Sequence, residues 1–325
     1  MKLLFSNLLF LMSVGILLIS ACSEDSTMNP ESENGVLSGT IYYNHYDGFS
    51  KLDLQTGEKT ILKGNGTHYN WHISADGTTL MEMTDGRSDG KPDQIKFVIK
   101  DLASGEIKHT FFYRPLNGGS NFQSADLSPD KSMICIFPSF DEGFVFLNAT
   151  NGQLIAHIDA INGERIPRYQ SFAWLPDNSL LFKWKNAIIR GKMPFDQLVV
   201  VKEFDTESFS DFSVSKDGQK VALNYKDHIA LMNTDGSDFY EVTSGEQKES
   251  GSAFSLDGRY LLVGTGFNSI GVPGSVPSSQ SYMKAIPLDG QTYDMSVDNP
   301  NVISIIPKGQ HNAEAKKGLM LWMPQ

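Results

Sequence analysis

A short turn motif that recurs along the chain constrains its fold more than any other feature. Each of five copies has an apolar residue, an aspartate three positions later, and then a run of β-forming residues. The aspartates are separated by 54, 47, 40 and 40 residues. Such recurrence is typical of architectures that repeat one supersecondary unit. The copies are Ile73-Ser74-Ala75-Asp76-Gly77, Leu127-Ser128-Pro129-Asp130, Trp174-Leu175-Pro176-Asp177-Asn178, Val214-Ser215-Lys216-Asp217-Gly218 and Phe254-Ser255-Leu256-Asp257-Gly258.

Each unit has the pattern of a small antiparallel sheet. Asp-Gly supplies the positive φ that a tight hairpin requires, and the aspartate can accept hydrogen bonds from the turn amides. An apolar strand follows each motif, as in Met133 to Phe137, and a second glycine turn follows in most units, as at Ser104-Gly105. Four short strands in about 40 to 45 residues, with almost no helix pattern, predict an all-β propeller.

The two ends of the chain are expected to complete the ring. The first three strands, from Thr40 to Leu62, have no aspartate turn before them, and Gly318 to Met323 is an apolar strand with no partner nearby in sequence. Joining them makes a sixth blade and hides sheet edges that would otherwise aggregate. The sequence therefore predicts a six-bladed β-propeller whose N- and C-terminal strands share the closing blade. Seven blades are the alternative if residues 300–325 hold more than one strand of their own.

These repeats resemble those of the TolB-type propeller family, whose blades carry an S-P-D-G turn followed by a short apolar strand. The resemblance covers roughly Val36 to Gln325 and implies the fold rather than a function, because the turn residues build the blade. Two departures stand out. The third motif ends in Pro176-Asp177-Asn178 and its unit lacks a clear second glycine turn, and a sixth aspartate motif is missing.

The N-terminus has the pattern of a secretory signal. Lys2 gives a positive start, residues 3–19 are almost continuously apolar, and Ser20-Ala21 precedes Cys22. The small pair before cysteine resembles the lipobox of bacterial lipoproteins, which implies cleavage before Cys22 and acyl chains on that residue. The alternative is an ordinary signal peptide or a single membrane span, for which the apolar run is marginal. The expected organisation is a signal peptide at 1–21, a lipidated tether at 22–35 and a propeller at 36–325.

The tether segment indicates an address at the cell envelope. Residues 23–35 are polar and acidic and cannot bury a core. Ser23-Glu24-Asp25 is similar to the surface-export signal of Bacteroidota-type lipoproteins, which implies an outer-membrane protein that faces outward. A periplasm-facing orientation is the alternative.

Charge and cysteine content exclude several classes of protein. Without Lys2 the chain has 26 basic and 38 acidic residues, which argues against nucleic acid and against a basic membrane-binding patch. Besides Cys22 the chain has one cysteine, Cys135, within an apolar run. We therefore expect a buried thiol and no disulfide.

Arginine placement suggests a ligand-binding rim. The loops that enter each blade and those between its second and third strands share one face of a propeller. Four of the six arginines fall in such loops, on an otherwise acidic protein. Arginine binds carboxylate or sulfate through paired hydrogen bonds, and neighbouring tyrosines suit sugar stacking. The candidate rim residues are Arg87, Arg114, Arg165, Arg168, Tyr69 and Tyr169; the alternative is that arginines simply collect in polar loops.

Metal ligands are weaker candidates. Asp85, Asp89 and Asp93 surround a glycine as in short calcium loops, but Arg87 stands where such loops carry an oxygen ligand. His68 and His72 lie four residues apart, a spacing of about 13 Å on a strand, so they cannot share a metal unless the chain bends. The prediction is therefore no cofactor, with calcium as the open alternative.

No nucleophile elbow, Ser/His/Asp set or phosphate loop is visible in the sequence. The glycine-rich run from Gly264 to Gln280 is expected to be a long loop between strands. The function predicted is that of a monomeric, non-enzymatic binding or scaffold module for an envelope protein or a glycan. The alternative is a carbohydrate-active enzyme, such as a metal-dependent polysaccharide lyase that uses the central funnel.

Overall fold

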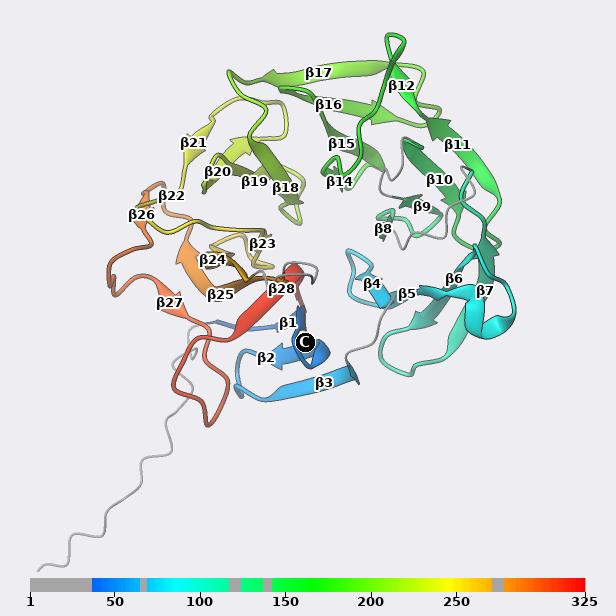
Figure 1. Ribbon diagram of the computed structural model, residues 1–325. Helices are drawn as coiled ribbons and strands as arrows, with labels where there is room; N and C mark the ends of the chain where they lie inside the picture. The colour runs from blue at the N-terminus through cyan, green and yellow to red at the C-terminus, as the bar shows by residue number, and fades with distance from the viewer. Residues whose placement is uncertain (1–36, 65–68, 117–123, 137–141, 271–277, 325) are drawn as a thin grey trace, which may run out of the picture.

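The protein is an all-β propeller in a computed structural model that describes residues 37–64, 69–116, 124–136, 142–270 and 278–324. Its sheets are arranged in a ring around a central axis, with one strand of each sheet nearest the centre (Figure 1). No helix among the described residues is both long and apolar enough to cross a membrane. The predicted signal peptide, Cys22 and the tether lie outside the described residues.

Four of the sheets have four antiparallel strands each. Within each of these sheets, strands that follow one another in sequence are neighbours in the sheet. The first two contain β4 (Tyr69–Ile73), β5 (Thr79–Asp85), β6 (Ile95–Asp101) and β7 (Ile107–Tyr113), then β8 (Ala125–Leu127), β9 (Met133–Ile136), β10 (Phe144–Asn148) and β11 (Leu154–Ile158). The next two contain β14 (Phe172–Trp174), β15 (Ser179–Trp184), β16 (Ala187–Lys192) and β17 (Leu198–Glu203), then β18 (Phe209–Val214), β19 (Lys220–Tyr225), β20 (His228–Asn233) and β21 (Tyr240–Glu241).

The remaining large sheet has eight strands and joins both ends of the described chain. Its path is β23-β24-β25-β28-β1-β2-β3, with β27 paired to β25. The strands are β23 (Ser252–Phe254), β24 (Tyr260–Ile270), β25 (Ser278–Pro287), β27 (Ile303–Ser304), β28 (Ala315–Met323), β1 (Thr40–His45), β2 (Gly48–Asp53) and β3 (Lys59–Gly64).

Short elements complete the fold. The 3-10 helix η1 (Gly86–Asp89) lies between β5 and β6. Two small pairs are formed by β12 (Ala160–Ile161) with β13 (Glu164–Arg165) and by β22 (Thr243–Ser244) with β26 (Tyr293–Asp294).

The predicted pairing of the chain ends is confirmed. β1 and β28 are antiparallel, with Thr40 opposite Met323 and Tyr43 opposite Met320. Gly39 precedes β1 with φ +100°, and a Cβ there would lie 2.6 Å from the backbone oxygen of Met323. Only glycine lets the two chain ends approach this closely.

The expected six separate blades are not found as six separate sheets. Hydrogen bonding gives four four-stranded sheets and the eight-stranded one. The reason is local: β25 continues to pair with β28, through Ser281 with Lys316 and Tyr282 with Ala315. These two residue pairs connect what the sequence pattern treats as neighbouring blades.

The core lies between neighbouring sheets rather than in one central mass. Met83 and Phe97, from β5 and β6, pack in one cluster with Ile134 of the next sheet. Fully burying such side chains stabilises a fold by roughly 1.5–3 kcal/mol each. Cys135 is completely buried in the adjoining cluster as a free thiol, as expected, and burial raises its pKa.

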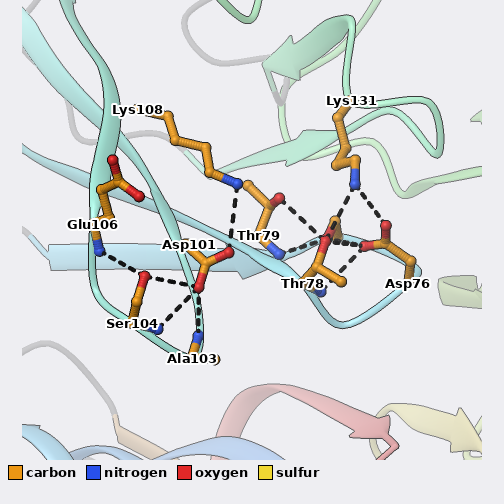
Figure 2. A network of polar contacts seen from close by, with 10 residues as sticks. Asp76, Thr78, Thr79, Asp101, Ala103, Ser104, Glu106, Lys108 and Lys131 are labelled. Carbon is orange, nitrogen blue, oxygen red and sulfur yellow. Dashed lines mark hydrogen bonds and ion pairs between the residues drawn. The ribbon is translucent and has the colours of Figure 1, made fainter.

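The motif aspartates organise their turns as predicted. In four copies the serine two positions earlier donates to the aspartate at 2.6–2.8 Å. In the third copy, which has no such serine, Ser179 donates to Asp177 instead. Figure 2 shows the first copy, where Lys131 from the next sheet donates to Asp76 at 2.6 Å. These carboxylates are therefore structural.

Candidate ligand pocket

A cavity of about 420 Å³ lies where the innermost strands meet. Its lining comes from β4, β8, β14, β18, β23 and β28, the strands nearest the centre in Figure 1. Turn residues at the ends of these strands, such as Pro129 and Pro176, also line it. The pocket therefore lies at the end of the ring that carries the aspartate turns. Its volume falls in the range of small-molecule sites, roughly 300–1,000 Å³.

The repeat itself places the pocket residues. The residue four positions before each motif aspartate stands at the same point of the innermost strand in every copy, and all five of these residues line the pocket. They are His72, Asp126, Ala173, Ser213 and Ala253. Two of the five are titratable, so the repeat brings a carboxyl and an imidazole into one cavity.

Most of the remaining wall is aromatic or aliphatic. Trp174 and Phe212 are only partly buried and line the cavity, together with Leu319 and Leu321 of β28. Trp174 Nε1 donates to the backbone oxygen of Asp126 at 3.4 Å, which orients the indole beside that residue. The cavity can therefore hold an apolar body against aromatic faces.

A hydrogen bond from the backbone determines the tautomer of the neutral His72 ring. The backbone N–H of Leu127 donates to its Nδ1 at 3.1 Å, so in the neutral ring the proton is on Nε2. Nε2 lies 3.8 Å from Oδ1 of Asp126, which is beyond a direct hydrogen bond. The two side chains are thus neighbours in the pocket rather than a tight pair.

Asp126 is the most unusual group in the pocket. Its side chain keeps 30% of its accessible surface, but burial raises its pKa, while His72 opposes that shift. The accessible part of Asp126 lies on the wall of the cavity. Among the described residues, its carboxylate accepts no hydrogen bond. A carboxyl in this setting is typical of a functional site.

Other polar groups of the pocket are already satisfied. The hydroxyls of Ser213 and Ser252 lie 2.8 Å apart and bond to each other. Asp76 is held by Lys131 and Ser74. Partial burial would raise the pKa of Asp76, but hydrogen bonds from Lys131 and Ser74 outweigh it and hold that pKa well below its usual range.

The predicted arginine rim lies at the other end of the ring. Arg87 is in η1, between the second and third strands of its sheet, and Arg114, Arg165 and Arg168 lie in segments that lead into the next innermost strand. Antiparallel order places these segments opposite the aspartate turns. All four side chains are exposed, and Arg87 pairs with Asp85 at 3.3 Å. The rim stays a prediction, separate from the pocket.

The two tyrosines of the rim differ in environment. Tyr169 is 76% exposed. Tyr69 is half-buried, donates to Glu82 at 2.7 Å, and has Lys63 Nζ 4.0 Å from its ring centroid. Burial and then this hydrogen bond raise the pKa of Tyr69. Tyr69 is therefore occupied by its own neighbours and is a poor platform for a sugar.

The candidate metal ligands do not converge. Asp85 caps η1 by accepting from the backbone of Arg87, and Asp89 pairs with Lys96 at 2.8 Å. Asp93 is exposed. His68 lies outside the described residues. Across the part of the chain that the structure describes, no three His, Cys, Asp or Glu side chains are grouped as metal ligands.

The loop predicted from Gly264 to Gln280 is wrong over much of its length. β24 extends to Ile270 and β25 begins at Ser278, and the two pair as far as Ile270 opposite Ser278. The glycines misled the prediction. Gly264 lies where a Cβ would come 2.4 Å from both Lys316 Cε and Ser281 Oγ, so it serves close packing rather than a turn. Residues 271–277 lie outside the described residues.

Comparison with known proteins points to the fold. No family model matches the chain, and no curated protein matches it. TolB from Acinetobacter baumannii aligns with a TM-score of 0.58 and 13% identity, over 88% of this chain and 67% of its own. A putative TolB from Agrobacterium tumefaciens aligns with a TM-score of 0.55 and 15% identity, over 89% of this chain and 99% of its own. The chain therefore has the β-propeller fold of TolB-like structures.

Proposed function

We propose that this protein is a non-enzymatic binding module of the cell envelope that engages its ligand or partner in the axial pocket. The observation that carries the proposal is the largely apolar cavity with one carboxylate that accepts no hydrogen bond among the described residues. Such a combination stabilises a bound group of matching shape and charge. The partner would be an envelope protein or a glycan.

The proposal includes six blades, with the eight-stranded sheet counted as two. Leu262 and Met283 of its β24–β25 half share one core cluster with Ile41 and Leu52 of its β1–β2 half. Residues on two halves of one flat sheet could not bury each other in this way, so the halves face each other as neighbouring blades do. Six core clusters then correspond to six junctions around the ring.

The envelope address rests on the sequence. Cys22 with its small preceding residues supports a lipid anchor, and the acidic segment after it supports the outer membrane, facing outward or toward the periplasm. Two or three acyl chains hold a protein stably in a bilayer, at about 0.8 kcal/mol per buried methylene. Mass spectrometry of the mature N-terminal peptide checks this: an unmodified Cys22 would contradict it.

Site-specific crosslinking in cells tests where the module binds. A photoreactive residue at Leu319, which lines the pocket and is 36% exposed, is expected to capture an envelope component. The second arm adds Ser213→Trp, at a partly buried position of the pocket wall, which should narrow the pocket and abolish that adduct. Adducts formed only from position Arg165 would favour the arginine rim instead, and an adduct that survives Ser213→Trp would contradict the pocket.

An assay for turnover tests the non-enzymatic part of the proposal. The purified protein is incubated with polygalacturonate and calcium, and the unsaturated product of a lyase is followed by its ultraviolet absorbance. No product above the level of a heat-denatured control is expected. Steady turnover would establish the enzymatic alternative.

A further inference from the structure

The charge of the pocket distinguishes between classes of ligand. Four titratable residues line it: His72, Asp76, Asp126 and Lys216. Asp76 is neutralised by Lys131 at 2.6 Å. Lys216 is an exposed turn residue, so water and salt screen its charge. What remains is the carboxylate of Asp126, with the imidazole of His72 beside it.

That carboxylate needs a cationic partner which the described chain does not supply. A carboxylate placed in an apolar space is costly unless it is paired, and electrostatic attraction is stronger there than in water. His72 is the neighbouring base, but its Nδ1 is occupied by the N–H of Leu127, and its Nε2 is 3.8 Å from Asp126.

Aromatic faces in the same cavity favour the same class of ligand. Trp174 and Phe212 are partly accessible on the cavity wall, and Trp174 Nε1 is bonded to the backbone of Asp126. An organic cation is attracted both by a carboxylate and by the faces of aromatic rings. A sulfated or carboxylated sugar would be repelled by Asp126, and a neutral sugar would find few free hydrogen-bonding groups.

We infer that the axial pocket selects an organic cation with an apolar body, in which an ammonium or guanidinium group pairs with Asp126 and the body packs on Trp174 and Phe212. This inference rests on the proposed binding function and narrows it to one ligand chemistry. The cation is either a free amine or the basic side chain of a protein partner, since both present the same group.

Three probes of equal size and different charge test the inference. Phenethylammonium, 2-phenylethanol and phenylacetate are titrated into the purified protein, and binding is followed by calorimetry and tryptophan fluorescence. We expect phenethylammonium to bind at least tenfold more tightly than 2-phenylethanol, and phenylacetate to bind weakest. Equal affinities for the three would overturn the cation inference while leaving the pocket intact. No binding of any probe would overturn both.

Two variants distinguish the effect of the Asp126 carboxylate on ligand preference from an effect on the fold. Asp126→Asn keeps the shape of the side chain and should remove the tenfold preference while retaining 2-phenylethanol binding. Asp227→Asn is the matched control, because the side chain of Asp227 is 56% exposed and does not line the pocket. It should keep the preference. A preference that survives Asp126→Asn contradicts the assignment.

A fourth probe identifies the source of the cation. N-acetyl-Phe-Lys-amide carries the same charge on a peptide. If the physiological ligand is a partner's side chain, this peptide binds at least as tightly as phenethylammonium. If the ligand is a free amine, the peptide binds more weakly than the amine but still loses affinity with Asp126→Asn.

Discussion

At the scale of single residues, Lys316 is the side chain whose burial has the clearest energetic consequence. It is 2% exposed on β28, and its Nζ donates to the backbone oxygen of Gly318 at 3.1 Å. Burial lowers the pKa of Lys316 from 10.5 to about 8, and the charge of Asp211 offsets part of that shift. The folded protein therefore binds this proton less tightly than the unfolded chain does.

The sign of the resulting pH dependence follows directly. Between about pH 8 and 10.5 the unfolded chain holds the proton and the folded protein has lost it, so stability rises with pH in that window. Lys316→Met should remove this rise and raise the free energy of unfolding at pH 7, by up to about 3 kcal/mol. Urea unfolding of both proteins at pH 7 and 10 measures it. Parallel stability curves would show that the amine is not desolvated in the folded state.

At the scale of elements, the junction of β1 with β28 depends on one glycine. Gly39 combines positive φ with a close approach to the backbone of Met323, so Gly39→Ala should destabilise the protein in two ways. Gly290→Ala is the matched control, because Gly290 has φ +83° and open space around its Cβ position. The control should cost about 1 kcal/mol.

Thermal unfolding compares the two variants. Gly39→Ala should lower the melting temperature clearly more than Gly290→Ala does, because the Met323 carbonyl must move and the first closing pair weakens. Equal decreases in melting temperature would mean that the β1–β28 junction adjusts without a free-energy cost. The positive φ alone would then account for the destabilisation of both variants.

Elements were predictable where short-range rules decide them. The aspartate turns follow from the hydrogen bonds that Asp and Ser make locally, and β28 was placed because an apolar strand needs a partner. The long hairpin of β24 and β25 was not predicted, because a glycine such as Gly264 favours a turn in a sequence pattern. In the structure, Gly264 instead leaves room for the side chains of Lys316 and Ser281. That role depends on residues far away in sequence.

At the scale of the whole molecule, the candidate pocket could not be predicted from the sequence, because its residues come from equivalent positions of five separate repeats. Asp126 and Ala253 occupy the same position in their units, but nothing local shows that this position faces the axis. Two of the five motifs carry a histidine or an aspartate at this position, where the other three carry small residues. The rim arginines were easier to identify, because charged residues in predicted loops can be recognised from the sequence alone. They lie at the opposite end of the ring from the cavity.

The closed ring predicts how the molecule responds to damage at its junction. Trp322 is 5% exposed, packs in the cluster that joins β24–β25 to β1–β2, and donates from Nε1 to the backbone of Ser38 at 2.8 Å. Trp322→Ala should cost about 3–5 kcal/mol. If closure makes the ring one cooperative unit, hydrogen exchange should accelerate even in β15, on the far side of the ring, and not only in β1 and β28. Trp322→Phe keeps most of the packing and loses the hydrogen bond, so it should show the same pattern at smaller amplitude. Faster exchange confined to β1, β2 and β28 would instead mean that each sheet opens independently and that closure contributes only locally.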